Sequence, residues 1–522
     1  MQPEGPHTLP GVLTRAAARH GPAIAIEDGE LRLSFAELKQ RVDEAAAGFV
    51  AAGIRRGDRV AIWGPNSAHW ITVALGAQSA GAAIVPLNTR LKGREAGYIL
   101  RRSGARLLCH SGAFLGLDFV GMLRDEVLPA LGETLELGTV EWDRFVGRAT
   151  ATHRAVVAER LAELTPHDLA DVMFTSGTTG QPKGVMSGHG QNVRVFTEWS
   201  SVVGLGPTDR YLIVNPFFHA FGYKAGWLAC LITGATILPM PVFDAAEVIR
   251  RIAADRITVL PGPPTLFQSM LAHPALDRAS TASLRLAVTG AANVPVSLIE
   301  RMRDELGFKA IVTGYGLTES TGTVSMCRPG DDPATIARSC GAPLPGIEVR
   351  IVNEAGEEVS RGVEGEIRVR GYNVMQGYLD DPAATAAAID AQGWLHTGDI
   401  GTMDELGYLR ITDRKKDMFI VGGFNCYPAE IESLISAHPA VAQVAVIGIP
   451  DERLGEVAAA YVVLRPAMTL DAETFIGWCR DNMANYKVPR RVHFVEALPT
   501  TASGKVQRFA LREPAIGGGA TS

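Results

Sequence analysis

The chain has 522 residues, enough for about three domains of ordinary size, and hydrophobic side chains make up 47% of it. Charged residues account for 20%, a balance that excludes an intrinsically disordered protein. The net charge of −6 excludes a general attraction to nucleic acid or to an anionic membrane. The six cysteines form no C-x-x-C pair, so we expect reduced thiols and no zinc site.

Two long stretches without charged side chains, 60–89 and 225–243, have the length of a membrane span. The first contains Pro65 and is predicted as strand, helix and strand, while the second is interrupted at Gly234 and Pro239. Buried βαβ units produce such uncharged runs because their strands are covered on both faces. The N-terminal residues also lack a basic segment followed by an apolar run, which predicts no secretory signal. We therefore expect a cytoplasmic protein without an integral membrane segment.

Helix-like and strand-like segments alternate along most of the chain, which is typical of an α/β fold with largely parallel sheets. Ser34 and Glu37 have the spacing of a capping box, and they predict an amphipathic helix that ends near Gly53. Further strand–helix units are predicted in the ranges 210–216, 235–243, 256–271 and 284–302.

The pattern changes after about residue 340, where alternating strands and glycine-rich turns predict a small β-rich subdomain. A charged run at 413–416 then indicates a domain boundary. Beyond it, the sequence predicts a helix starting at Pro428, two strands, a second helix and a last strand. We therefore predict two α/β lobes and a β-rich lobe within 1–413, followed by a small α+β domain over 417–522.

The strongest chemical signal is FTSGTTGQPKGV, residues 174–185, in which an apolar strand leads into a loop of hydroxyl residues and glycines. Glycines let backbone N–H groups approach phosphate oxygens, hydroxyls add donors, and Lys183 supplies positive charge. A flexible surface turn is the alternative for a loop of this composition. The motif is not a Walker A loop, because the residue after Lys183 is glycine. The loop consists of Thr175, Ser176, Gly177, Thr178, Thr179 and Gly180.

This string resembles the phosphate-binding signature of the adenylate-forming superfamily: acyl-CoA and aryl-CoA synthetases, adenylation domains of peptide synthetases, and luciferases. The resemblance covers essentially the whole chain, because four further signatures follow in the family's order, TGYGLTES at 313–320, GWLHTGDIG at 393–401, ITDRKKDMFIVGGFNCYPAEIE at 411–432 and TASGKVQR at 501–508. It implies a large N-terminal region, a hinge at 414–416 and a small mobile C-terminal domain.

The resemblance also implies a nucleotide site. Tyr315 would stack on adenine, Thr318 would contact phosphate, and Glu319 would hold Mg²⁺, a cation that favours carboxylate and phosphate oxygens. Asp399 and Arg414 would contact the ribose. Read without the family, a glutamate in such a segment is more often a solvated acid. The remaining implied residues of the nucleotide site are Gly290, Ala291, Ala292, Thr313, Gly314 and Gly316.

The last signature contributes Lys505, which the resemblance implies as the cation that neutralises charge developing between the carboxylate and the α-phosphate. Without the family resemblance, a lysine in such a loop would be a solvent-exposed residue without a specific role. Lys416 falls at the implied hinge, and its alternative is a solvated linker residue. The implied coenzyme A path is formed by Gly422, Gly423 and Phe424. The implied catalytic set is Lys505, Glu319, Thr175 and His219.

Two apolar segments, 215–227 and 258–267, fall where the family builds its acyl pocket. His219 resembles a family histidine near the carboxylate, although a lone histidine between phenylalanines is otherwise more often packed in a core. Lys224 is unusual in this apolar segment, and it either faces a polar substrate atom or caps a helix. The expected pocket residues are Phe218, His219, Tyr223, Lys224, Trp227 and Gly262.

Together these motifs predict an ATP-dependent acyl-CoA synthetase that uses ATP, Mg²⁺ and coenzyme A. The aromatic side chains favour a compact cyclic or short-to-medium-chain acid. The strings NPFFHAFGYKAG, VLPGPPT, VTGAANVP and MCRPGDD in 215–332 also resemble an actinobacterial branch that acts on a propanoate derived from steroid rings. An enzyme that loads a carrier-protein thiol, a luciferase-like oxygenase and a non-catalytic nucleotide-binding protein are the alternatives. The expected partners are small molecules and not nucleic acid, and assembly into a homo-oligomer stays open.

Overall fold

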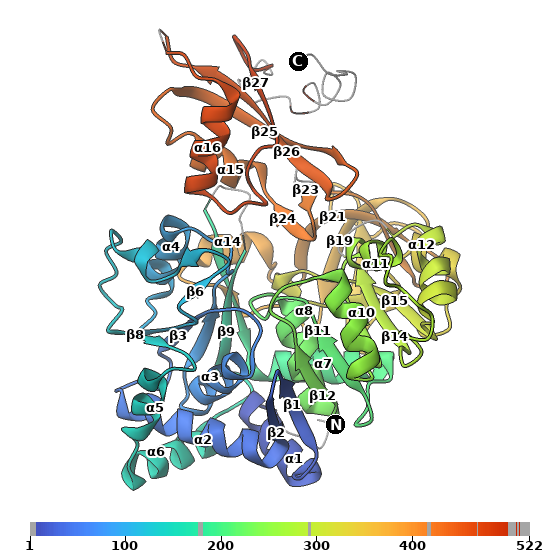
Figure 1. The fold of residues 1–522 in the computed structure, drawn as a ribbon. Helices are drawn as coiled ribbons and strands as arrows, with labels where there is room; N and C mark the ends of the chain where they lie inside the picture. The colour runs from blue at the N-terminus through green and yellow to red at the C-terminus, as the bar shows by residue number, and fades with distance from the viewer. Residues whose placement is uncertain are drawn as a thin grey trace. The chain divides into compact units, whose positions relative to one another are not determined.

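The computed structural model describes residues 7–175, 181–290, 294–414, 419–466, 468–499, 508 and 511. Its contacts divide the chain into two units. Unit 1 contains most of the chain up to Thr412, and unit 2 contains Asp413–Ser522 together with two short segments, Arg90–Ala96 and Thr175–Lys183. Figure 1 follows the chain from blue to red, and the red end of the bar, beyond residue 412, belongs to unit 2.

A nine-stranded sheet forms the first layer of unit 1. Its central strands are parallel, and antiparallel strands close both edges. Parallel strands need crossover connections, which the helices between them provide. The strands, in sheet order, are β17 (Ala342–Pro343), β16 (Ser325–Met326), β15 (Ala310–Tyr315), β14 (Leu286–Gly290), β13 (Val259–Pro261), β11 (Arg210–Ile213), β12 (Thr236–Pro239), β1 (Ile24–Asp28) and β2 (Leu31–Ser34).

A seven-stranded sheet forms the second layer of unit 1. Its parallel part is built around β3 and β4, whose residues are almost all buried, as expected for strands covered on both faces. The strands, in sheet order, are β20 (Gly377–Tyr378), β10 (Lys183–Gly188), β9 (Leu169–Thr175), β4 (Ala83–Pro86), β3 (Arg59–Trp63), β5 (Leu107–His110) and β8 (Glu133–Glu136). A small hairpin, β6 (Ala113–Phe114) and β7 (Leu117–Asp118), lies outside this sheet.

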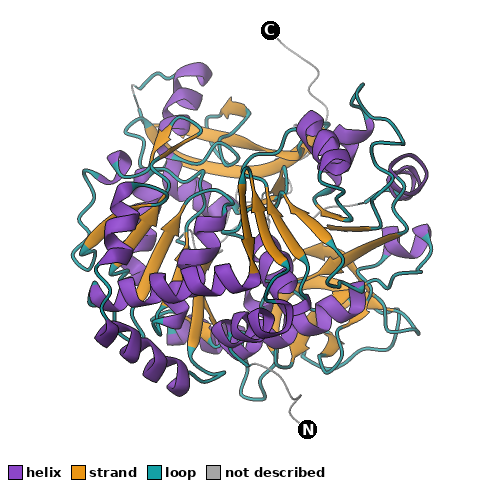
Figure 2. Cartoon of the chain, turned by 60° about the horizontal axis from the view of Figure 1, so that its bottom comes forward, coloured by secondary structure: helices purple, strands orange, loops and turns teal. Residues whose placement is uncertain are grey.

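Helices pack against the strands of unit 1, as the purple and orange elements of Figure 2 show. The capping box predicted for α2 is confirmed, since Ser34 and Glu37 exchange both of its hydrogen bonds. The helices are α1 (Leu9–His20), α2 (Phe35–Ala51), α3 (Ala68–Ser79), α4 (Gly93–Ser103), η1 (Gly121–Leu123), α5 (Val140–Gly147), α6 (Ala151–Glu163), α7 (His189–Val203), α8 (Ala220–Gly222), η2 (Tyr223–Leu228), α9 (Ala229–Thr233), α10 (Ala245–Ala254), α11 (Pro264–Leu271), α12 (Val296–Arg301), η3 (Met302–Leu306), η4 (Thr318–Ser320), α13 (Pro333–Arg338) and α14 (Pro382–Ala388).

The β-rich part of unit 1 is a four-stranded sheet, as the alternating pattern after residue 340 predicts. Its strands, in sheet order, are β18 (Glu348–Val352), β19 (Gly365–Arg370), β21 (Leu395–Met403) and β22 (Leu409–Arg414). Apolar side chains of all three sheets join one buried core. No helix in the described ranges is long and apolar enough to cross a bilayer.

Unit 2 has its own buried core, built on one mixed sheet and two helices. The helix predicted at Pro428 is confirmed as α15 (Pro428–Ile435), and the second predicted helix as α16 (Ala472–Asn482). The strands are β24 (Phe424–Cys426), β23 (Phe419–Val421), β26 (Gly455–Leu464), β25 (Val441–Asp451) and β27 (Arg491–Phe494), and β27 runs parallel to β26. The expected α/β class, with a large N-terminal region and a smaller C-terminal domain, is confirmed.

The six cysteines are all free thiols. Five of them are buried, and Cys340 alone is half-buried. This agrees with the expectation of reduced cysteines without a disulfide framework.

Candidate active site

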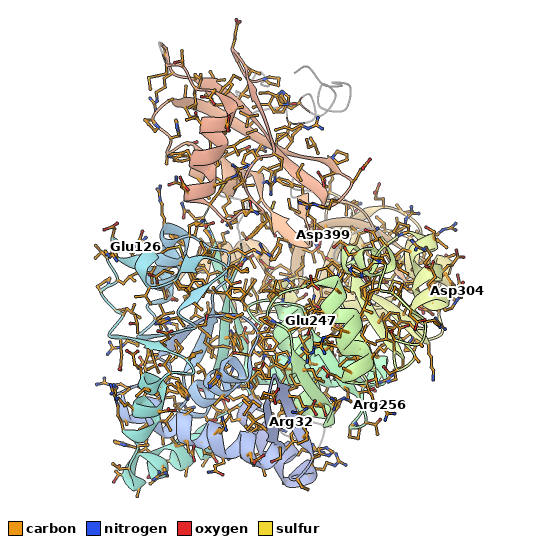
Figure 3. The ribbon with its side chains drawn as sticks, viewed as in Figure 1. Arg32, Glu126, Glu247, Arg256, Asp304 and Asp399 are labelled. Atoms are coloured by element: carbon orange, nitrogen blue, oxygen red, sulfur yellow. The ribbon has the colours of Figure 1, made fainter. Side chains whose placement is uncertain are left out.

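Tyr315 and Asp399, 84 residues apart, meet in unit 1. Tyr315 ends the parallel strand β15, and Asp399, labelled in Figure 3, lies on β21 of the neighbouring sheet. The Tyr315 hydroxyl donates to Asp399 Oδ2 over 2.6 Å, the length of a charge-assisted hydrogen bond. The two residues are 6% and 4% exposed. The expected adenine and ribose residues therefore form one rigid pair.

A tight turn follows β15 and carries the expected phosphate and metal residues, Thr318 and Glu319. Gly316 is required in it, because a Cβ atom there would lie 2.2 Å from the carbonyl oxygen of Gly322. The Glu319 carboxylate is half-buried, and its Oε1 accepts a hydrogen bond from the Tyr378 hydroxyl over 2.9 Å. The sequence reading missed Tyr378, which reaches Glu319 from a strand 59 residues later.

The floor beside this turn is made of backbone. Gly290 ends β14 directly opposite Gly314 on β15. The φ angle of Gly290 is 153°, and a Cβ atom there would lie 3.2 Å from the carbonyl oxygen of Gly314. Ala291 and Ala292, expected to continue this wall, lie outside the described residues.

Thr313, another expected nucleotide residue, is buried just before this turn. Its hydroxyl contacts Cys327 Sγ and the carbonyl oxygens of Ile336 and Ser339 at 3.1–3.3 Å. These contacts tie β15 to α13, so the hydroxyl serves the packing of the strand.

The expected phosphate loop is described only at its two ends. Thr175 closes β9 and Lys183 opens β10, and both are half-buried. The loop residues between them, 176–180, lie outside the described residues. Lys416 and Lys505 also lie outside them, and of Arg414 only the backbone, at the end of β22, is described.

Among the residues expected to line the acyl pocket, Phe218 is half-buried and His219 is exposed. His219 caps α8, and its Nδ1 accepts a hydrogen bond from the backbone N–H of Phe221 over 3.2 Å. Although the ring is exposed, the protein around it lowers its pKa through desolvation. Because Nδ1 accepts this hydrogen bond, Nε2 is the ring nitrogen that carries a hydrogen.

Tyr223 and Trp227, also expected in the pocket, are fully buried and stack on each other, with ring centroids 4.8 Å apart. Both rings also pack near Trp70 in the core of unit 1. They lie in η2, a π-helical segment with a kink at Gly226. Such segments concentrate at functional sites. A direct contact of either ring with an acyl group stays a prediction. Gly262, on the neighbouring strand end, is buried against Leu266.

Lys224 is paired with a buried carboxylate. The sequence predicted either a contact with a polar substrate atom or a helix cap, and neither includes this ion pair. Its Nζ lies 3.1 Å from Asp171 Oδ1 and 3.2 Å from Ser187 Oγ, and the side chains of Lys224 and Asp171 are completely buried. Asn192 donates to Asp171 Oδ2 over 2.8 Å. Desolvation lowers the pKa of Lys224, and Asp171 opposes that shift. The pair joins η2 to β9, the strand that ends at Thr175.

In unit 2, the expected coenzyme A residues form a two-residue hairpin between β23 and β24. Gly422 and Gly423 have φ angles of 55° and 88°, which only glycine adopts readily. Phe424 follows and stacks on Tyr486, with ring centroids 4.6 Å apart. The hairpin therefore presents bare backbone next to a fixed aromatic ring.

The donor set suits a cation that arrives with a nucleotide. The described residues contain no group of three or more histidine, cysteine, aspartate or glutamate side chains able to hold a metal alone. Mg²⁺ is bound in many phosphate sites by one or two carboxylates together with phosphate oxygens. A single carboxylate in a hydroxyl-rich turn, as at Glu319, fits that mode.

The comparison with protein families decides the identity. The family model for AMP-binding enzymes matches residues 13–379, and the model for the C-terminal domain of AMP-binding enzymes matches residues 430–505. The chain belongs to the AMP-binding enzyme family. Similar relatives in this family are acyl-CoA ligases. This chain is likewise an ATP-dependent acid–CoA ligase.

Two similar relatives carry the same name, 3-[(3aS,4S,7aS)-7a-methyl-1,5-dioxo-octahydro-1H-inden-4-yl]propanoyl:CoA ligase. The one from Rhodococcus jostii is 50% identical over 98% of this chain and 99% of its own length. The one from Mycobacterium tuberculosis is 49% identical over 97% and 98%. Feruloyl-CoA synthase from Amycolatopsis is 38% identical over 95% and 96%.

Solved structures agree with this assignment. An o-succinylbenzoate CoA synthetase from Bacillus subtilis, bound to a product analogue, has a TM-score of 0.83 and 28% identity, and the match covers 96% of this chain and 98% of that one. A fatty acyl CoA synthetase from Mycobacterium tuberculosis has a TM-score of 0.72 and 32% identity, over 97% and 98%.

Proposed function

We propose that this ligase activates the propanoate side chain of a compact fused-ring keto acid and transfers the acyl group to coenzyme A. The observation that carries this proposal is the near-50% identity, over almost the full length, to two ligases named for such an acid. In this proposal the buried aromatic cluster of Tyr223, Trp227 and Trp70 limits the length of the acyl pocket.

In the first half-reaction, a carboxylate oxygen of the acid bonds to the α-phosphorus of ATP, and pyrophosphate leaves to give the acyl-adenylate. Tyr315 and Asp399 would hold adenine and ribose as one unit, because their mutual hydrogen bond fixes both side chains. Arg414 would provide the second ribose contact. Lys183 and the loop hydroxyls would hold the phosphates.

Glu319 is the residue that would hold Mg²⁺ with the nucleotide, and Thr318 would contact a phosphate. When bound, the cation supplies positive charge beside the phosphate oxygens. Lys505 would add a second positive charge where negative charge develops, which is a preorganised electrostatic contribution.

In the second half-reaction, the thiol sulfur of coenzyme A bonds to the acyl carbon and AMP leaves, with the thiol proton passing to solvent or a base. His219 would face the reacting carboxyl group with its Nε2–H as a donor. The Gly422–Gly423 hairpin would line the thiol path, since bare backbone admits a narrow chain. The C-terminal domain would turn about Lys416 between the two half-reactions.

The proposal is tested by measuring kcat/KM for coenzyme A-dependent AMP release across five acids. The panel is octanoate, palmitate, benzoate, 3-cyclohexylpropanoate and the fused-ring diketo propanoate. We expect the last acid to exceed palmitate by about a hundredfold or more, because a pocket shaped for fused rings and a pocket shaped for a long straight chain bind the two transition states differently. A higher kcat/KM for palmitate would contradict the proposed acid, while ATP–pyrophosphate exchange with none of them would contradict the chemistry.

A further inference from the structure

A short segment of unit 1, residues 373–379, connects the turn that carries Glu319 with β10, the strand that follows the expected phosphate loop. On one side, this segment is hydrogen-bonded to the turn that carries Glu319. The backbone N–H of Met375 donates to the Glu319 carbonyl oxygen over 2.9 Å. The Thr321 hydroxyl donates to the Asn373 carbonyl oxygen over 2.7 Å. The turn therefore has a fixed backbone position relative to this segment, which we call the bridging segment.

On its other side, the bridging segment is the edge strand β20, which pairs antiparallel with β10. Val185 stands opposite Tyr378, and Met186 stands opposite Gly377. The backbone N–H of Leu379 also donates to the carbonyl oxygen of Gly184 over 2.7 Å. Gly184 directly follows Lys183 in the sequence, so the bridging segment is registered against the strand that begins with that lysine.

Tyr378 is held at the centre of this connection. Its backbone N–H donates to Thr385 Oγ1 over 2.9 Å, and its hydroxyl donates to Glu319 Oε1 over 2.9 Å. The preceding Gly377 has a φ angle of 141°, and a Cβ atom there would lie 2.9 Å from Thr385 Cγ2. The backbone on both sides of Tyr378 is therefore held in place, and the hydrogen bond from its hydroxyl to Glu319 selects the direction of its ring.

We propose that Tyr378 is a positioning residue for Glu319, which orients the carboxylate for the Mg²⁺ that accompanies ATP. This inference rests on the proposed function, in particular on Glu319 as the metal residue. A carboxylate on a turn has several rotamers of similar energy, and a hydrogen bond to one oxygen selects among them. Outer partners of metal ligands that act in this way are worth about 10- to 100-fold in metal affinity.

The test is a Tyr378→Phe enzyme, which keeps the ring and loses the hydroxyl. The first measurement is the apparent Kd of Mn²⁺ in the presence of a non-hydrolysable ATP analogue, from the free Mn²⁺ signal in electron paramagnetic resonance. The second is the Mg²⁺ concentration that gives half-maximal ATP–pyrophosphate exchange. We expect both to rise about tenfold in Tyr378→Phe, while the KM for coenzyme A changes less than about twofold.

Tyr372→Phe is the matched control, because Tyr372 is six residues earlier and its hydroxyl donates to the carbonyl oxygen of Pro345 over 2.9 Å. Unchanged Mn²⁺ affinity in Tyr378→Phe, or an equal loss in both variants, would overturn the inference. Glu319→Gln separates the two levels of the argument. If it leaves Mn²⁺ affinity intact, the metal role of Glu319 fails and the inference fails with it. If only Glu319→Gln weakens Mn²⁺, the metal role stands and the role of Tyr378 alone is wrong.

Discussion

At the scale of single residues, His189 has an environment that ties stability to pH. It is 1% exposed at the start of α7, and its Nδ1 accepts a hydrogen bond from the backbone N–H of Leu9 over 3.3 Å. Burial lowers its pKa from 6.5 to about 4, with Asp168 acting in the opposite direction. The folded protein therefore keeps this ring neutral under conditions in which the unfolded chain protonates it.

A His189→Asn enzyme should lose part of the acid sensitivity of the wild type. Between pH 6.5 and about 4 the unfolded wild-type chain binds one more proton at this position, so stability falls as pH falls. The contribution is about 1.4 kcal/mol per pH unit within that window, and it is absent above it. Urea unfolding at pH 7, 6 and 5 measures it. Equal slopes for wild type and His189→Asn would contradict the assignment.

Lys505 provides a second prediction at this scale, on activity. Lys505→Ala should lower adenylate formation by about a hundredfold or more, because its charge is assigned to the first transition state only. With preformed acyl-adenylate and coenzyme A supplied, thioester formation should stay close to that of the wild type. An equal fall in both assays would show that Lys505 serves both half-reactions.

At the scale of elements, the buried pair Lys224–Asp171 holds η2 and β9 together. Lys224→Met should destabilise the protein by about 3–5 kcal/mol, because it leaves Asp171 buried without its cation. The double variant Lys224→Met/Asp171→Asn should be more stable than Lys224→Met, because no uncompensated charge is then buried. Denaturant unfolding measures both. The exposed pair of Arg250 and Glu247 is the control, and Arg250→Met should cost less than about 1 kcal/mol. A double variant that loses the sum of both single changes would contradict this account.

The same pair shows where sequence reasoning reaches its limit. Local signals were sufficient for α2, whose cap lies within four residues, and for α15, which starts at a proline. Tyr315 and Asp399 were predicted because each lies in a short contiguous sequence motif that resembles the family's signatures. Lys224 and Tyr378 were not understood, because the partner of each is 53 or 59 residues away in the chain. Such pairings are decided by sheet order, which composition and periodicity do not encode.

At the scale of the whole molecule, the chain between the two domains should control the second half-reaction. Lys416→Pro fixes φ near −65° and restricts the preceding residue, so a rotation about this position is blocked. ATP–pyrophosphate exchange should stay within about twofold of the wild type, while thioester formation should fall by about tenfold or more. Lys415→Pro serves as the comparison, because it fixes the φ angle of residue 415 and leaves that of Lys416 free. Equal losses in exchange and thioester formation would show that Lys416 is not the pivot.

The burial of the cysteines decides how a thiol reagent can be used to follow the consumption of coenzyme A by this enzyme. Burial raises the pKa of five of the thiols, and that of Cys479 rises to about 12, so little reactive thiolate exists at neutral pH. A chromogenic disulfide reagent should therefore titrate at most Cys340 rapidly in the native enzyme and all six thiols after denaturation. Free coenzyme A is the main fast-reacting thiol in such a mixture. Its consumption can be read directly from colour, and a late rise in that colour without turnover would report unfolding.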